Sequence, residues 1–132
     1  MKGESPAKVK IRRFEDLVVW QKARELAKGI YLVSARGAFS RDFGLRDQLR
    51  RAAVSMMANV AEGFERGGRG EFHQFLSMAK GSCGEARSSL YAAQDASYLT
   101  SLEFARLLKL TDEIGRMLGR MRRTVGAQRG LK

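Results

Sequence analysis

The sequence has very few of the residues that interrupt or cross-link a chain. Among its 132 residues there is one proline, Pro6, and one cysteine, Cys83. A single cysteine cannot form a disulfide within the chain, so we expect the reducing cytoplasm as its compartment. Because proline breaks helices and none follows Pro6, the composition favours long helices over sheet. At this length we expect one domain.

Long apolar runs are also absent. No stretch approaches the roughly 18 apolar residues that a membrane-spanning helix needs, and the first residues lack the apolar segment of a signal peptide. Hydrophobic residues make up 44% of the chain and charged residues 30%, which is typical of a soluble globular protein. We therefore expect no membrane insertion.

Acidic residues are scarce at both ends of the sequence, and the net charge is +11. Residues 1–13 carry five basic side chains and one acid, and residues 116–132 carry six basic side chains and no acid. The residues between them are nearly neutral, with 14 basic and 13 acidic side chains. Basic ends are common and unspecific, so this charge distribution does not by itself identify a nucleic-acid-binding protein.

Apolar residues recur at spacings of three and four through most of the chain, as they do in amphipathic helices. The longest such series runs from Phe72 to Ser97 in seven consecutive steps. That continuity is typical of helices that pack in a bundle. The predicted segments are a flexible basic arm at 1–13, helices at about 17–34, 42–63, 71–99 and 101–123, and a basic tail at 124–132.

Helix signals at the ends of these segments agree with short connections. Asp16 precedes the first apolar stripe as an N-cap, and Thr100 with Glu103 forms a capping box immediately after the third helix. A connection this short requires the third and fourth helices to be antiparallel, and Phe39 is expected to close one end of the bundle. The predicted fold is therefore all-α, an up-down-up-down antiparallel four-helix bundle.

Polar side chains interrupt the expected buried face of the second helix. Antiparallel pairing predicts that an arginine of the pair Arg50 and Arg51 meets Glu85, and that Asn59 bonds to a side chain of the third helix. Such a layer fixes the register of the helices more than it stabilises them; a ligand site or an interface is the alternative. The predicted layer comprises Arg50, Arg51, Ser55, Asn59, Glu62, Ser82 and Glu85.

The fourth helix carries a second apolar row beside its core stripe. This row contains Leu108, Leu110, Gly115 and Met117. It indicates either a wide core stripe or a subunit interface, in which Leu108, Leu110 and Met117 would contact another copy of the chain.

None of the residue patterns that signal catalysis is complete. His73 is the one histidine and has no glutamate three residues before it, so the paired Glu-x-x-His ligands of di-iron bundles are missing. Cys83 lies on the core stripe, and Gly81 with Gly84 is not followed by the lysine of a phosphate-binding loop. We expect no catalytic residue, no metal site and no cofactor, and hence no enzyme.

Arginines near the end of the fourth helix share one face. Arg116, Arg120 and Arg123 are spaced four and three residues apart, with Arg122 to the side. They could bind nucleic-acid phosphates or an anionic membrane surface. The alternative is a solvated helix end whose positive charge complements the helix dipole.

Four segments taken together resemble a known family. Residues 14–20 read Phe-Glu-Asp-Leu-Val-Val-Trp, residues 49–55 read Leu-Arg-Arg-Ala-Ala-Val-Ser, and residues 59–63 read Asn-Val-Ala-Glu-Gly. The fourth segment begins with Glu-Phe at 71 and ends at Glu85. In this order and spacing, over about residues 14–121, the chain is similar to the four-helix-bundle proteins of the 23S rRNA-intervening-sequence family. It departs from them at Gly67 and Gly68, where relatives commonly have a serine, and in its basic ends.

The resemblance implies a homopentamer without catalytic residues. Some members are encoded inside intervening sequences of ribosomal RNA genes. Others resemble the accessory variability determinant of diversity-generating retroelements, a pentamer that binds nucleic acid and works with a reverse transcriptase. We expect a cytoplasmic, non-catalytic homo-oligomer that binds RNA or DNA through basic surface as an accessory factor, with a reverse transcriptase as one partner. The alternative is a structural or protein-interaction scaffold without a nucleic-acid role.

Overall fold

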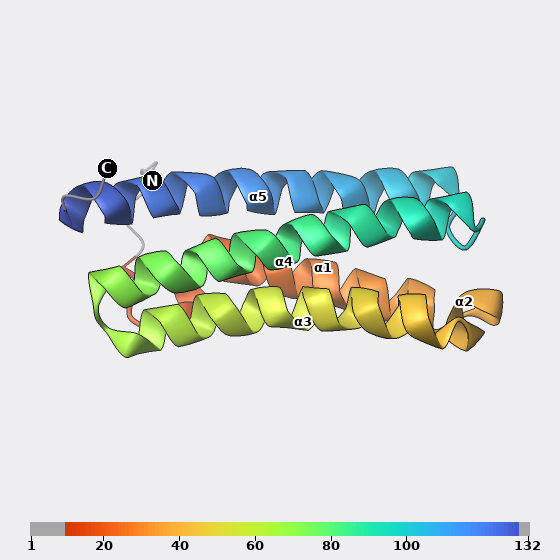
Figure 1. The fold of residues 1–132 in the computed structure, drawn as a ribbon, viewed down its shortest axis with the longest axis horizontal. Helices are drawn as coiled ribbons and strands as arrows, with labels where there is room; N and C mark the ends of the chain where they lie inside the picture. Colours follow the sequence, from red (N-terminus) through yellow and green to blue (C-terminus); the bar gives the residue numbers. More distant parts are fainter. Residues whose placement is uncertain (1–9, 130–132) are drawn as a thin grey trace, which may run out of the picture.

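The computed structural model describes residues 10–129, and all regular secondary structure in this range is helical (Figure 1). The expected all-α class is confirmed. In chain order the elements are η1 (a 3₁₀ helix, Phe14–Asp16), α1 (Val18–Ser34), α2 (Gly37–Arg41), α3 (Phe43–Arg66), α4 (Arg69–Asp95) and α5 (Ser101–Arg129).

The four long helices lie alongside one another along the long direction of the molecule (Figure 1). Helix α3 packs against α4, α4 packs against α5, and α1 packs against both α3 and α5. Followed by colour, the chain runs in one direction along α1 and α4 and in the other along α3 and α5 (Figure 1). None of the helices between residues 10 and 129 combines the length and apolar character that crossing a membrane requires.

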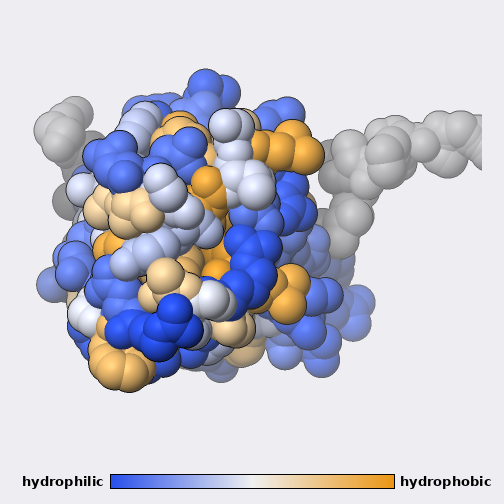
Figure 2. Space-filling view, turned by 90° about the vertical axis from the view of Figure 1, so that its right-hand side faces the viewer, coloured by the Kyte–Doolittle hydropathy of each residue, from blue (hydrophilic) through white to orange (hydrophobic). Residues whose placement is uncertain are grey.

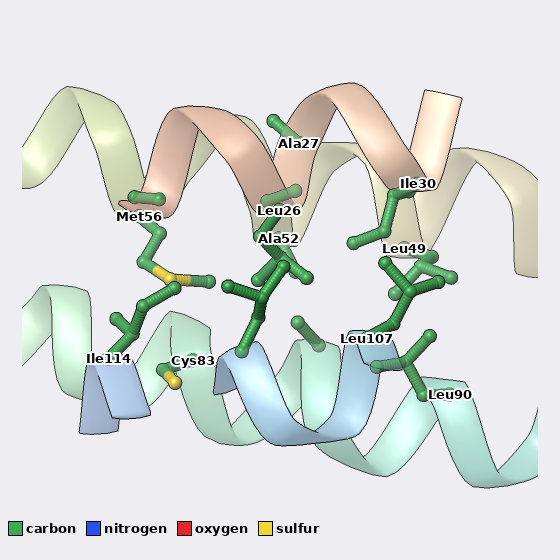
Figure 3. Packing of buried hydrophobic residues seen from close by; sticks show 14 of the residues in the cluster. Leu26, Ala27, Ile30, Leu49, Ala52, Met56, Cys83, Leu90, Leu107 and Ile114 are labelled. Atoms are coloured by element: carbon green, nitrogen blue, oxygen red, sulfur yellow. The ribbon is translucent and has the colours of Figure 1, made fainter. Parts of the chain in front are cut away.

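One hydrophobic core fills the space between these helices. Leu26 and Ile30 of α1, Leu49 of α3, Leu90 of α4 and Leu107 of α5 are fully buried and converge in Figure 3. Removing a side chain of this size from water contributes about 1.5–3 kcal/mol, so the core is the main source of stability. In α4 the expected periodic series supplies all the buried residues except Ser82 and Ser89: Leu76, Ala79, Cys83, Ala86, Leu90 and Ala93.

The start of α1 and the end of α4 differ from the sequence-based expectation. Asp16 does not cap α1, since its Oδ2 accepts from the backbone N–H groups of Arg12 and Arg13 and α1 begins after Leu17. Helix α4 ends at Asp95 and not near residue 99, because Ser97 adopts a left-handed conformation with φ of 64°. The N–H of Tyr98 then bonds back to the carbonyl of Ala93, which satisfies a free carbonyl at the helix end.

The remaining differences concern the connection after α1 and the C-terminal segment. The short helix α2 lies between the first two predicted helices, where no helix was expected. Helix α5 continues past residue 123 to Arg129, so most of the predicted tail is helical. The parts of the predicted arm and tail at 1–9 and 130–132 lie outside the described residues.

The end of the bundle near α2 is closed by side chains from three connections. The ring of Phe39 is buried and stacks on Tyr98 with centroids 4.8 Å apart. The Tyr98 hydroxyl donates to Asp42 Oδ2 at 2.9 Å, while Asp42 Oδ1 accepts from the N–H of Leu45 at 3.2 Å and caps α3. The expected position of Phe39 at this end is thus correct. Figure 2 views this end and shows hydrophobic atoms in several separate places on a mainly hydrophilic surface.

Candidate nucleic-acid interface

A basic groove of about 550 Å³ lies between α4 and α5. Helix α4 contributes Lys80 and Arg87. Helix α5 contributes four arginines and one acid, Asp112, which is the single carboxylate among the described lining residues. The basic groove is lined by Lys80, Cys83, Gly84, Arg87, Thr111, Asp112, Gly115, Arg116, Gly119, Arg120, Arg122 and Arg123.

Helical spacing explains why these charges meet. On α4, Lys80, Gly84 and Arg87 are four and three residues apart and therefore share one face. On α5 the same spacing joins Arg116, Arg120 and Arg123. Since α4 and α5 are packed neighbours, the two faces border the same groove.

Three glycines keep the floor of the basic groove open. A Cβ added at Gly84 would meet no other atom within 4 Å. At Gly115 it would lie 3.8 Å from Cys83 Sγ, and at Gly119 it would lie 3.6 Å from the Arg123 Nη1. These are ordinary or absent contacts, so the glycines are not required for close helix packing at this place. Their effect is that side-chain volume is missing where the two helices border the groove.

Hydrogen bonds between α4 and α5 hold two of the arginines in place. Arg122 Nε of α5 donates to Ser77 Oγ of α4 at 2.8 Å. Arg87 Nη1 of α4 donates to Thr111 Oγ1 of α5 at 3.4 Å. Each contact uses only part of a guanidinium group with five N–H donors, so most donors remain for a ligand.

The other arginines lie at the rim. Arg116 Nη2 pairs with Asp112 Oδ2 at 2.6 Å, one helical turn away. Arg120 and Arg123 are exposed. An exposed guanidinium keeps its full charge and binds phosphate oxygens in a bidentate manner.

Cys83 lies at the floor as a neutral thiol. Burial raises the pKa of the Cys83 thiol above its ordinary value. Its Sγ donates to the backbone carbonyl of Thr111 at 3.2 Å. Since the thiolate is the nucleophilic form, this environment favours packing over reaction.

The four arginines singled out in the sequence, Arg116, Arg120, Arg122 and Arg123, all line the basic groove. Sequence reasoning missed Lys80 and Arg87, because α4 was judged by its apolar series alone. The signal was present: both are offset from that series by one residue, next to Ala79 and Ala86, and are seven residues apart. Seven residues are two helical turns, so they lie on one side of α4.

The residues of the predicted polar layer are divided among several contacts. Ser55 Oγ and Ser82 Oγ are 3.0 Å apart and join α3 to α4. Asn59 Nδ2 donates to the carbonyl and the hydroxyl of Ser55, so it reaches α4 only through Ser55. The expected direct bond from Asn59 to α4 is therefore wrong. Glu62 is exposed and pairs with Arg66 at 2.7 Å.

The expected pairing of an arginine with Glu85 is also wrong. Arg50 turns toward α1, where its Nε donates to Ser34 Oγ at 2.8 Å and its guanidinium lies 4.5 Å from the centre of the Tyr31 ring. Arg51 and Glu85 are exposed. Antiparallel register predicts neighbours on one adjacent helix only, whereas α3 also borders α1, which offers Arg50 a hydroxyl and an aromatic face.

The second apolar row of α5 is mostly used within the chain. Leu110 is 7% exposed and belongs to the core, so it is not available to another subunit. Leu108 and Met117 are half-buried, and Met117 packs against the core. The wide core stripe thus accounts for Leu110.

Comparisons with known proteins identify the family. The model of the 23S rRNA-intervening sequence protein family matches residues 15–120. No curated protein matches the sequence. A crystal structure of a protein with unknown function, from the S23 ribosomal protein family of Bacteroides thetaiotaomicron, is similar in fold with a TM-score of 0.73. That similarity has 22% sequence identity and covers 80% of this chain and 96% of the other. The matched family model spans most of the bundle, and the chain belongs to the 23S rRNA-intervening sequence protein family.

Proposed function

We propose that this protein binds nucleic acid, without catalysing a reaction on it, through the basic groove between α4 and α5. The observation that carries the proposal is six cationic side chains and one acid around a single groove, contributed by two neighbouring helices. A solvated helix end would need positive charge on one helix only. Here Lys80 and Arg87 add positive charge away from the ends of α4. The helix dipole favours positive charge only near the C-terminal turn, so it does not explain them.

Binding would rest on phosphate contacts. Each phosphate neutralised by lysine or arginine releases counterions, which makes the affinity fall as salt rises. Arg87 and Arg122 are held by hydrogen bonds between α4 and α5. Arg120 and Arg123 are exposed, so they can bind the phosphates of a nucleic-acid backbone that lies along the basic groove. The name of the family refers to a ribosomal RNA intervening sequence, which favours RNA as the first ligand to test.

Fluorescence anisotropy with labelled single-stranded RNA at several salt concentrations tests this function. Six cations line the basic groove, and one of them, Arg116, is paired with Asp112. If the other five contact phosphates, the plot of log affinity against log salt should have a slope of about −3 to −4, since each contact on a single strand contributes about −0.7. Absence of binding at low salt, or affinity that does not change with salt, would contradict the proposal.

We also propose that the protein acts as a homo-oligomer, with a pentamer as the expected state. Apolar side chains on α1 and α3 support this: Leu32 is 63% exposed, and Tyr31 and Val54 are each 44% exposed. Exposed apolar groups of this size favour burial against another chain. If the basic groove does not bind nucleic acid, the exposed Leu32, Tyr31 and Val54 favour the alternative of a protein-interaction scaffold. A reverse transcriptase is the partner protein to test for an accessory role.

Light scattering coupled to size-exclusion chromatography measures the assembly directly. We expect a mass near five times the 14.7 kDa of the chain. Replacing Leu32 by glutamate should shift the mass toward that of the monomer, since it places a charge among the apolar groups. A monomer in the unmodified protein would contradict the oligomer proposal and leave the groove proposal intact.

A further inference from the structure

Asp112 is a misfit in a site for phosphates alone. It lies on the basic groove, and its side chain is 43% exposed. A carboxylate repels phosphate and lowers the affinity that the surrounding arginines provide. Its Oδ2 accepts from Arg116 Nη2 at 2.6 Å, which holds the group at the rim of the groove. A carboxylate has about four acceptor positions, so this pair leaves most of them open to a ligand.

We propose that the basic groove takes one unpaired guanine of a single-stranded nucleic acid, and that Asp112 reads its Watson–Crick edge. The inference rests on the proposed nucleic-acid binding and specifies its ligand. Asp112 would accept from N1–H and from the N2 amino group, while Arg120, Arg123 and Lys80 bind the flanking phosphates. Arg116 then acts as a positioning residue that orients the carboxylate.

The shape of the basic groove favours a single base. Its floor is formed where Gly84, Gly115 and Gly119 lack side chains between two packed helices. A flat ring can lie against such a surface, and a volume of about 550 Å³ accommodates one nucleotide. A base pair within a duplex keeps its Watson–Crick edge occupied by its partner, so Asp112 could not reach it. Proteins that read single strands use these edges of unstacked bases.

The chemistry of the four bases favours guanine. Guanine presents two adjacent N–H donors on its Watson–Crick edge, which matches the two oxygens of a carboxylate. Adenine and cytosine present one amino group beside an acceptor nitrogen, and that nitrogen would face a carboxylate oxygen. Uracil and thymine present one N–H between two carbonyl oxygens. Specificity by hydrogen bonds depends on this match, whereas phosphate contacts are the same for every sequence.

Fluorescence anisotropy tests the proposal with short oligouridines, and with the corresponding DNA oligothymidines. Each oligonucleotide carries one central guanine, adenine, cytosine or hypoxanthine. The guanine oligonucleotide should bind about tenfold more tightly than the adenine one, which is the discrimination of a good bidentate contact. Hypoxanthine keeps N1–H and lacks the N2 amino group, so its affinity should lie between the two. Equal preference in RNA and DNA is expected, since the contact is to the base.

Two isosteric variants of neighbouring residues separate base reading from charge. Asp112→Asn and Glu113→Gln each remove one negative charge from α5, and Glu113 pairs with Lys22 of α1, away from the groove. The preference for guanine should disappear in Asp112→Asn and persist in Glu113→Gln. Retention of the preference in Asp112→Asn would overturn the inference.

The outcomes distinguish this inference from the proposed function. Salt-dependent binding of all oligonucleotides with equal affinity would overturn the guanine site and leave nucleic-acid binding in place. Failure to bind any of them would contradict both. A duplex that binds as tightly as the guanine single strand would also overturn the inference, because its base edges are occupied.

Discussion

At the residue scale, glycines of this chain have opposite roles in the packing of α4. Gly63 of α3 is buried against α4, where an added Cβ would come within 2.7 Å of the Phe75 Cβ. Gly84 of α4 borders open space in the basic groove. The first glycine therefore permits close helix approach, and the second leaves the groove accessible.

Alanine substitutions should reveal this difference. Gly63→Ala should lower the free energy of unfolding by about 1–3 kcal/mol, because the new methyl overpacks the contact with Phe75. Gly84→Ala should raise it by up to about 1 kcal/mol, since alanine is the better helix former and meets no neighbour. Urea unfolding followed by circular dichroism measures both. Equal effects of the two substitutions would contradict the packing described for α3 and α4.

Sequence reasoning at this scale identified the polar residues of α3 but not their partners: Asn59 bonds to Ser55 within its own helix, and Arg50 bonds to α1. Ser55 and Ser82 were both expected in the polar layer, and they do contact each other between α3 and α4. The partner of Arg50 does not follow from the register of α3 and α4, because Arg50 contacts Ser34 and Tyr31 on α1. A periodic pattern predicts that a residue faces the other helices, but it does not predict which of two neighbouring helices supplies its hydrogen-bond partner.

At the element scale, the ends of the helices are fixed by a few specific side chains. Thr100 Oγ1 accepts from the N–H of Glu103, and Glu103 Oε1 accepts from the N–H of Thr100, which completes the capping box of α5. The same carboxylate binds Arg36, between α1 and α2, through two bonds of 2.6 and 2.8 Å. One side chain thus caps α5 and ties it to the connection after α1.

This arrangement gives a pH dependence. The hydrogen bonds from Arg36, followed by the backbone bond from Thr100, lower the pKa of Glu103 from 4.5 to about 2. A carboxyl whose pKa is lowered by folding stabilises the protein above its unfolded pKa, and the contribution is lost as the pH falls toward the folded value. Compared with Glu103→Gln, the native protein should be more stable by about 1 kcal/mol at neutral pH, a value typical of partly exposed pairs and caps.

Thermal or urea unfolding at several pH values measures this difference. It should be constant above about pH 6, since the unfolded carboxyl is then almost fully ionised. It should shrink between about pH 4.5 and pH 2, the window set by the two pKa values. A difference that grows on acidification would show that Glu103 is not stabilised in its ionised form.

The helices themselves were predictable from sequence because their apolar residues recur over many turns. The start of α5 was predictable too, from the capping box of Thr100 and Glu103. The end of α4 was not, because it depends on contacts between distant segments. Helix α4 stops at Asp95 where Ser97 turns left-handed, which positions Tyr98 to stack on Phe39 and to bond to Asp42. The sequence near residue 97 does not show that Tyr98 will bond to a residue more than 50 positions away.

At the scale of the whole molecule, four of the six basic residues counted at the C-terminal end line the basic groove on the bundle: Arg116, Arg120, Arg122 and Arg123. The arginines of α5 were recognisable from their spacing. The groove itself was not, because it requires α4 and α5 to meet with Gly84, Gly115 and Gly119 at their border. Its two further cations, Lys80 and Arg87, become part of the site only through that packing.

We propose that the basic groove, and not the total charge of the chain, binds nucleic acid. The most direct measurement compares the salt dependence of RNA binding for two double variants. Arg120→Ala with Arg123→Ala removes two exposed charges from the groove, while Lys28→Ala with Arg106→Ala removes two exposed charges elsewhere. The groove variant should bind more weakly and lose about 1.4 units of salt slope, at about 0.7 per phosphate contact, while the control should keep the slope of the native protein. An equal loss in both variants, or an unchanged slope in the groove variant, would show that the basic groove is not the binding site.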